Sequence, residues 1–215
     1  MTGPKTRVAV LISGRGSNMV SLIEAARATD YPAEIALVLA NRPGAEGLAR
    51  AKQAGIPAWA IDHRAFPDRA AFDAALDADL RTAGIELVCL AGFMRVLTPG
   101  FVERWAGRMI NIHPSLLPLF RGTHTHARAL EAGVRLHGCT VHYVVPELDA
   151  GPIIAQAAVP VREGDDPDSL AARVIVQEHR LYPAALALVA SGRARLEGGR
   201  VVLDAQAPEG ALLSL

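Results

Sequence analysis

The sequence is poor in cysteine, in aromatic residues and in net charge. Its 215 residues include two cysteines and 5% aromatics, and 22 Lys and Arg balance 22 Asp and Glu. We expect Cys89 and Cys139, which both lie in apolar runs, to be buried free thiols and not a disulfide or a catalytic pair. The balanced charge argues against a broad nucleic-acid surface, although a local phosphate site needs only a few donors.

Long apolar runs are absent as well. No run approaches the length of a membrane span, and residues 1–7 lack the apolar stretch of a signal peptide. We therefore expect a cytoplasmic protein that binds no membrane. Hydrophobic residues nevertheless make up 51% of the chain, mostly Ala, Val and Leu. A chain of this length and composition can bury an aliphatic core in one domain.

Apolar strand patterns alternate with helical patterns through the first half of the chain. The predicted strands are Val8–Ile12, Ile35–Ala40, Ala58–Ile61 and Leu87–Ala91, and helices are predicted after residue 18, over Glu46–Ala54 and over Asp68–Thr82. This alternation predicts an α/β fold, with a mostly parallel central sheet and helices on both faces. Because ligands bind outside the carboxyl ends of such strands, the segments that follow them are the place to look for a site.

The second half is less regular. We expect strands at Gly138–Val145 and Pro152–Val161, a helix at Asp168–Ala190 that Pro183 kinks or restarts, and a small hairpin at Arg195–Asp204. Residues 1–190 would form the catalytic domain. Residues 191–215 would be a short extension of the same domain, with 207–215 loosely ordered.

The segment Ser13–Asn18, SGRGSN, lies between the first predicted strand and the first predicted helix. Its glycines permit a tight turn and a close approach to a ligand, and the N-terminus of the helix offers free N–H groups to an anion. It lacks the third glycine of a dinucleotide fingerprint and the lysine of a P-loop. A plain tight turn, with Ser17 capping the helix, is the alternative.

Three further polar residues attract attention. In an extended Met109–His113, Asn111 and His113 share one face, and Pro114 favours that extended backbone. An amide N–H can bind an oxyanion, an imidazole can move a proton, and a carboxylate such as Asp149 favours the charged imidazole. A structural histidine beside a turn and a turn-forming aspartate are the alternatives. The seven histidines show no metal-binding spacing, so we expect no metal.

Several segments resemble, in order and spacing, those of folate-dependent formyltransferases of the phosphoribosylglycinamide branch. They are LISGRGSN at 11–18, AGFMRVLTPGF at 91–101, NIHPSLLP at 111–118 and ELDAGPIIAQ at 147–156, with further similarity in HTHARALEAG at 124–133, HGCTVHYV at 137–144 and VQEHRLYP at 176–183. NIHPSLLP marks the wider formyltransferase family. The GSN loop and the short chain favour the glycinamide branch.

The resemblance implies a Rossmann-like formyltransferase fold and a set of site residues. Asn111, His113 and Asp149 match the family's catalytic trio. The positions matched to the ribonucleotide site are Gly16, Ser17, Asn18 and Glu178, and those matched to the folate site are Arg69, Met94, Arg95, Val96, Leu97, Asn111, Val145, Pro146, Glu147, Leu148 and Asp149. The sequence departs from the family pattern at Arg15, Arg121 and Thr123, which lie outside the trio.

The implied reaction moves the formyl group of 10-formyltetrahydrofolate, a co-substrate, to the amine of glycinamide ribonucleotide in de novo purine (IMP) biosynthesis. The partners would be small molecules, with no nucleic acid and no membrane, and the protein a monomer or homodimer.

Three alternatives remain open. Formyltetrahydrofolate deformylase would use water in place of the amine, but its relatives carry an extra N-terminal domain and Val8 lies too near the start. Methionyl-tRNA formyltransferase would need a basic C-terminal domain, whereas the tail after Ala190 is short and carries both signs of charge. A non-catalytic nucleotide-binding module would keep the loop at 13–18 but would not need the trio.

Overall fold

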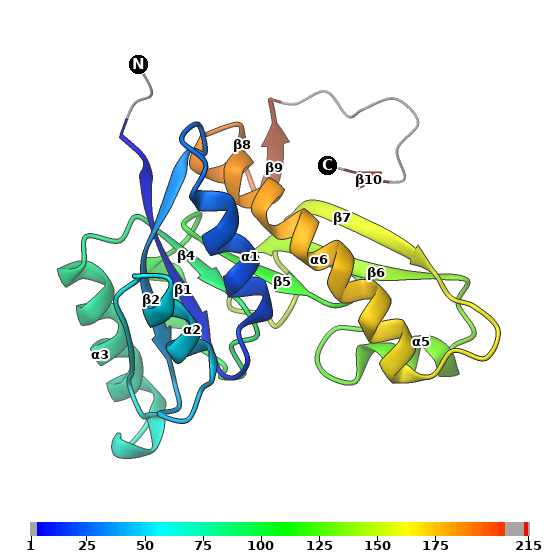
Figure 1. Ribbon diagram of the computed structural model, residues 1–215, viewed down its shortest axis with the longest axis horizontal. Coiled ribbons are helices and arrows are strands. Elements are labelled where there is room, and N and C mark those ends of the chain that lie inside the picture. The colour runs from blue at the N-terminus through cyan, green and yellow to red at the C-terminus, as the bar shows by residue number, and fades with distance from the viewer. Residues whose placement is uncertain (1–3, 205–212, 215) are drawn as a thin grey trace.

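The computed structural model describes residues 4–204 and 213–214, arranged as one large sheet flanked by helices (Figure 1). The sheet has the strand order β10-β7-β6-β5-β4-β1-β2-β3, and β8 and β9 form a separate hairpin. The strands are β1 (Thr6–Ile12), β2 (Ala33–Ala40), β3 (Ala58–Ala60), β4 (Leu87–Leu90), β5 (Met109–His113), β6 (Leu136–Tyr143), β7 (Ile153–Pro160), β8 (Ala194–Glu197), β9 (Arg200–Leu203) and β10 (Leu213–Ser214). The helices are α1 (Ser17–Ala26), α2 (Gly47–Gln53), the 3-10 turn η1 (His63–Ala65), α3 (Arg69–Thr82), α4 (Pro99–Arg104), α5 (Thr125–Glu131) and α6 (Pro167–Ala190).

The predicted α/β fold with a mostly parallel sheet is confirmed. Strands β1 to β5 pair in parallel in the order β3-β2-β1-β4-β5, whereas β6, β7 and β10 add to that edge in antiparallel pairs. The chain therefore reverses its direction of travel across the sheet between β1 and β4. In parallel sheets such a reversal opens a crevice at the carboxyl ends of the two strands.

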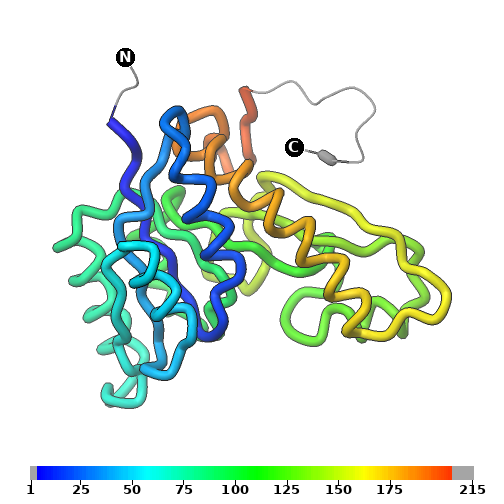
Figure 2. The backbone as a smooth tube through the Cα atoms, in the orientation of Figure 1, coloured from blue at the N-terminus to red at the C-terminus, as the bar shows by residue number. Residues whose placement is uncertain are grey.

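Side chains of β1 alternate between two hydrophobic cores, one on each face of the sheet. Val8, Val10 and Ile12 pack in the core covered by α1, α2 and α6, and Ala9 and Leu11 pack in the core covered by α3 and α4. A strand buried on both faces reads as a continuous apolar run, which is why the sequence shows no polar alternation here. Helices α1 and α6 lie side by side over one face (Figure 2).

Some local predictions were wrong. Helices α4 and α5, of 6 and 7 residues, were not predicted, because they are too short to show a helical period. Helix α6 continues through Pro183 without restarting. The N-cap of α1 is Gly16 with no side-chain cap, so the alternative in which Ser17 caps the helix is excluded. The loose segment expected at 207–215 lies outside the described residues, except that Leu213–Ser214 forms β10.

The predictions for the two cysteines and for the C-terminal hairpin are confirmed. Cys89 and Cys139 are both buried free thiols, as predicted. The hairpin β8–β9 stands where a hairpin was expected. In the part of the chain that the structure describes, no helix combines the length and the apolar character needed to cross a membrane.

Candidate active site

The loops that follow β1 and β4 meet at the crevice between these two strands. Ser13 joins them, because its Oγ donates to Asn41 Oδ1 at 2.7 Å and accepts the Met94 backbone N–H at 2.7 Å. Asn41 follows β2, so one buried hydroxyl links the loops after three strands. This edge of the sheet is where parallel folds bind ligands.

The loop at residues 14–16 ends at Gly16, whose backbone conformation only glycine adopts easily. Gly16 has φ +70°, and a Cβ at this position would lie 3.2 Å from the Cα of Gly47. The Gly47 N–H also donates to the Gly14 carbonyl at 3.0 Å, which holds the loop against α2. The first turn of α1 carries no side-chain cap and no acidic residue. Its N–H groups and the positive end of its dipole are therefore available to an anion.

Asn18 connects this loop to α6. Its Nδ2 donates to Glu178 Oε2 at 2.6 Å, and both side chains are buried. Burial raises the pKa of the Glu178 carboxyl, and the hydrogen bond from Asn18 opposes that rise only in part. Asn18 Oδ1 is buried without a hydrogen-bond partner among residues 4–204. Buried polar atoms are normally satisfied, so an unpaired acceptor here is consistent with a place for a ligand.

The structure brings Asn111, His113 and Asp149 together. Asn111 and His113 lie on β5, and His113 Nδ1 is 3.4 Å from Asp149 Oδ2. His113 Nε2 lies 3.0 Å from the Phe120 carbonyl oxygen. A carbonyl can only accept, so Nε2 carries a proton, and Nδ1 faces the Asp149 carboxylate.

A strained turn holds Asp149 in place. Asp149 has φ +49°, a conformation that costs a non-glycine residue free energy. Two residues on, a Cβ at Gly151 would lie 1.7 Å from the Tyr143 carbonyl oxygen, so only glycine fits against β6. The Pro152 carbonyl accepts the Tyr143 N–H at 2.9 Å. This close packing fixes the carboxylate at the end of β5.

Apart from Asn111 on β5, the positions matched to the folate site lie on two loops and at the start of α3. Met94, Val96 and Leu148 are exposed by 69%, 52% and 58%, which is unusual for large apolar side chains and provides apolar surface for a flat ring. Leu97 is buried, and the guanidinium of Arg95 lies 4.6 Å from the centre of the Phe72 ring. Of the remaining positions, Val145 is half-buried, and Arg69, Pro146 and Glu147 are exposed.

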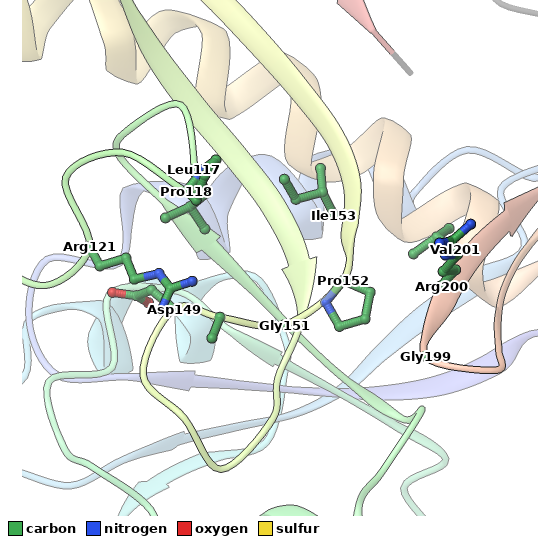
Figure 3. A pocket seen from close by; sticks show the side chains of 11 residues that line it. Leu117, Pro118, Arg121, Asp149, Gly151, Pro152, Ile153, Gly199, Arg200 and Val201 are labelled. Carbon is green, nitrogen blue, oxygen red and sulfur yellow. The ribbon is translucent and has the colours of Figure 1, made fainter.

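A cavity of about 370 Å³ adjoins Asp149. Figure 3 shows Arg121 and Asp149 close together at one end of it and the tip of the β8–β9 hairpin, Gly199–Val201, at the other. Arg121 Nη1 also donates to Glu147 Oε1 at 2.6 Å. This departure from the family pattern therefore ties the loop after β5 to the loop that carries Asp149.

A second histidine, His142, belongs to the cluster around Asn111 and Asp149 and was not predicted from the sequence. His142 on β6 is buried, and its Nε2 lies 3.1 Å from Asn111 Nδ2 and 3.9 Å from Asp149 Oδ1. Only the antiparallel register of β5 and β6, which sets Asn111 opposite His142, reveals it. A long connection joins β5 to β6, so no local sequence pattern predicts this register.

Comparison with known proteins settles the family. A family model described as formyl transferase matches residues 6–186. The chain belongs to the formyl transferase family. It is 45% identical over 199 residues to phosphoribosylglycinamide formyltransferase from Escherichia coli (strain K12), covering 93% of this chain and 94% of that protein.

Two further relatives agree with this membership. Identity to the trifunctional purine biosynthetic protein adenosine-3 of Gallus gallus is 52% over 198 residues, which is 92% of this chain but 20% of that protein, so the chain spans about a fifth of its length. The solved structure of glycinamide ribonucleotide transformylase 1 from Symbiobacterium toebii superposes with a TM-score of 0.90 at 47% identity, covering 93% of this formyl transferase and 94% of that chain.

Proposed function

We propose that this formyl transferase moves the formyl group of 10-formyltetrahydrofolate to the primary amine of glycinamide ribonucleotide, a step of purine biosynthesis. The single observation that carries the proposal is the cluster of Asn111, His113 and Asp149 beside the crevice, with the 3.4 Å distance between His113 and Asp149. The similarity to phosphoribosylglycinamide formyltransferases over most of the chain supports the choice of substrates.

The binding roles follow from the two sides of the crevice. The N–H groups of Gly16, Ser17 and Asn18 would hold the phosphate, and Glu178 would meet the same substrate. The folate would lie against the exposed apolar residues of the loops at 91–97 and 145–149. The cytoplasmic location and the monomeric or dimeric state expected from the sequence stay part of the proposal.

The chemistry balances without a covalent enzyme intermediate. The neutral amine attacks the formyl carbon, and the carbonyl oxygen becomes an oxyanion that accepts hydrogen bonds from Asn111 and from imidazolium His113. The carbon–N10 bond then breaks, N10 gains a proton, and the new amide nitrogen loses one. Asp149 keeps the imidazole charged and oriented.

The test separates a transferase from a deformylase. With 10-formyltetrahydrofolate alone we expect little release of tetrahydrofolate, and adding glycinamide ribonucleotide should raise it greatly. A phosphate-anchored amine gains an effective concentration of ~10⁵ M or more, whereas water has no such anchor. The folate absorbance reports the release. Fast release that ignores the ribonucleotide would refute the transferase and favour the hydrolase.

A further inference from the structure

His142 is a buried histidine whose two ring nitrogens have different partners. Its Nδ1 lies 2.8 Å from the backbone carbonyl oxygen of Tyr143, and its Nε2 lies 3.1 Å from Asn111 Nδ2. Because a carbonyl oxygen can only accept, Nδ1 must carry the proton. In a neutral ring Nε2 then has a lone pair and must be the acceptor of the second hydrogen bond.

The surroundings of His142 keep its ring neutral. Burial lowers the pKa of His142 and outweighs the opposing effects of the Tyr143 carbonyl and the Asp149 carboxylate, and nearby His113 lowers it further. The ring therefore offers Asn111 an acceptor. The amide of Asn111 must turn its nitrogen towards β6, because its oxygen would face the lone pair of Nε2.

This orientation matters for what Asn111 presents to a substrate. One N–H of the amide is used by His142, and in the described part of the chain the Asn111 side chain has no other hydrogen-bond partner. The second N–H is thus left to donate. With the amide reversed, the carbonyl oxygen would take the place of this donor and would repel a developing oxyanion.

We propose that His142 is a positioning residue that locks the Asn111 side-chain amide in the orientation that offers an N–H to the formyl oxygen. The expected effect on catalysis rests on the proposed function, whereas the expected orientation of the Asn111 amide does not. His142 would touch neither substrate, and its effect on catalysis would pass through Asn111.

The geometric part is tested on the unaltered protein. A long-range proton–nitrogen NMR correlation of the His142 ring should show the tautomer protonated at Nδ1, with one Asn111 amide proton shifted by its hydrogen bond. A ring protonated at Nε2 would overturn the proposal. This measurement needs no substrate, so it separates failure of the lock from failure of the formyl-transfer assignment.

The catalytic part is tested with a pair of variants. His142→Leu removes the acceptor, and we expect kcat to fall by a factor of about 3 to 10, the range for one hydrogen bond, with KM for both substrates nearly unchanged. His142→Gln can accept through its carbonyl oxygen and should recover most of the loss. Equal losses in the two variants would contradict the lock.

A double-mutant cycle excludes a merely structural role. In an Asn111→Ala background there is no amide to orient, so adding His142→Leu should cost almost no further kcat. A general disturbance of the fold would lower kcat by the same factor in both backgrounds. That additive result would overturn the proposal even if each single variant behaved as expected.

Discussion

One carboxylate oxygen of Asp149 serves two groups at once. Oδ2 accepts the backbone N–H of Gly122 at 2.8 Å and lies 3.4 Å from His113 Nδ1. The carboxylate thus fixes the loop after β5 and provides a counter-charge to the imidazole. Since Phe120 O in the same loop lies against His113 Nε2, this loop and the Asp149 carboxylate enclose the ring.

Removing the imidazole should abolish most of the turnover. For His113→Ala we expect a loss of ~10²–10⁴ in kcat, the usual contribution of a positioned proton donor. Asp149→Asn should also lower kcat, by a smaller factor, because it keeps the ring but removes the counter-charge. Initial rates with purified variants measure both effects, and circular dichroism checks the fold. Near-normal turnover by His113→Ala would exclude its assigned role.

Gly16 should be needed for the ribonucleotide and not for the folate. A side chain in Gly16→Val would meet Gly47 Cα at 3.2 Å in a backbone with φ +70°, so the loop must change its shape. Strain of this kind costs about 1–3 kcal/mol. Calorimetry with each substrate should show weakened ribonucleotide binding.

The matched control for Gly16 is Gly14→Ala, since a Cβ at Gly14 meets no atom within 4 Å. We expect this variant to bind both substrates normally. Loss of folate binding by Gly16→Val, with unchanged ribonucleotide binding, would contradict the assignment of the two sides of the crevice.

Gly151→Ala should damage the site although it changes no polar group. The new Cβ would overlap the Tyr143 carbonyl oxygen at 1.7 Å, so the loop that carries Asp149 must move away from β6. We expect lower thermal stability and a large fall in kcat. Gly100→Ala, where a Cβ meets nothing within 4 Å, should leave both nearly unchanged. Wild-type kcat in Gly151→Ala would show that Asp149 does not depend on this contact.

Acid should destabilise the fold through two facing histidines. His126 Nδ1 lies 3.2 Å from His137 Nε2, and burial lowers the pKa of His137 from 6.5 to about 4 and lowers that of His126 as well. Well above pH 6.5 both folded and unfolded states are neutral at these rings. As the pH falls from 6.5 towards 4, the unfolded chain binds protons that the folded chain rejects, so the free energy of unfolding decreases.

Urea unfolding across that pH window measures this loss. We expect His137→Gln, which has no titrating ring, to lose less stability than the wild-type protein between pH 6.5 and about 4. Parallel losses in the two proteins would show that His137 does not contribute to the acid sensitivity.

The sequence predicts the parallel half of the fold well, because its signals are local. The apolar run of β1, the glycine turn and the period of α1 are each encoded in consecutive residues, and so is the alternation that puts Asn111 and His113 on one face of β5. The partners of these residues are not local. Phe120 O lies in a loop without periodicity, and His142 reaches Asn111 only through the β5–β6 register.

The hydroxyl of Ser13 couples the loops on the two sides of the crevice. It holds Asn41 and the Met94 N–H together with the start of the loop at 14–18, so these segments cannot shift independently without breaking one of two 2.7 Å hydrogen bonds. A ligand that tightens the loop at 14–18 would therefore change the free energy of ordering the loop at 91–97. By thermodynamic linkage the reverse would hold with equal magnitude, so substrates bound at these two loops would alter each other's affinity through the Ser13 side chain.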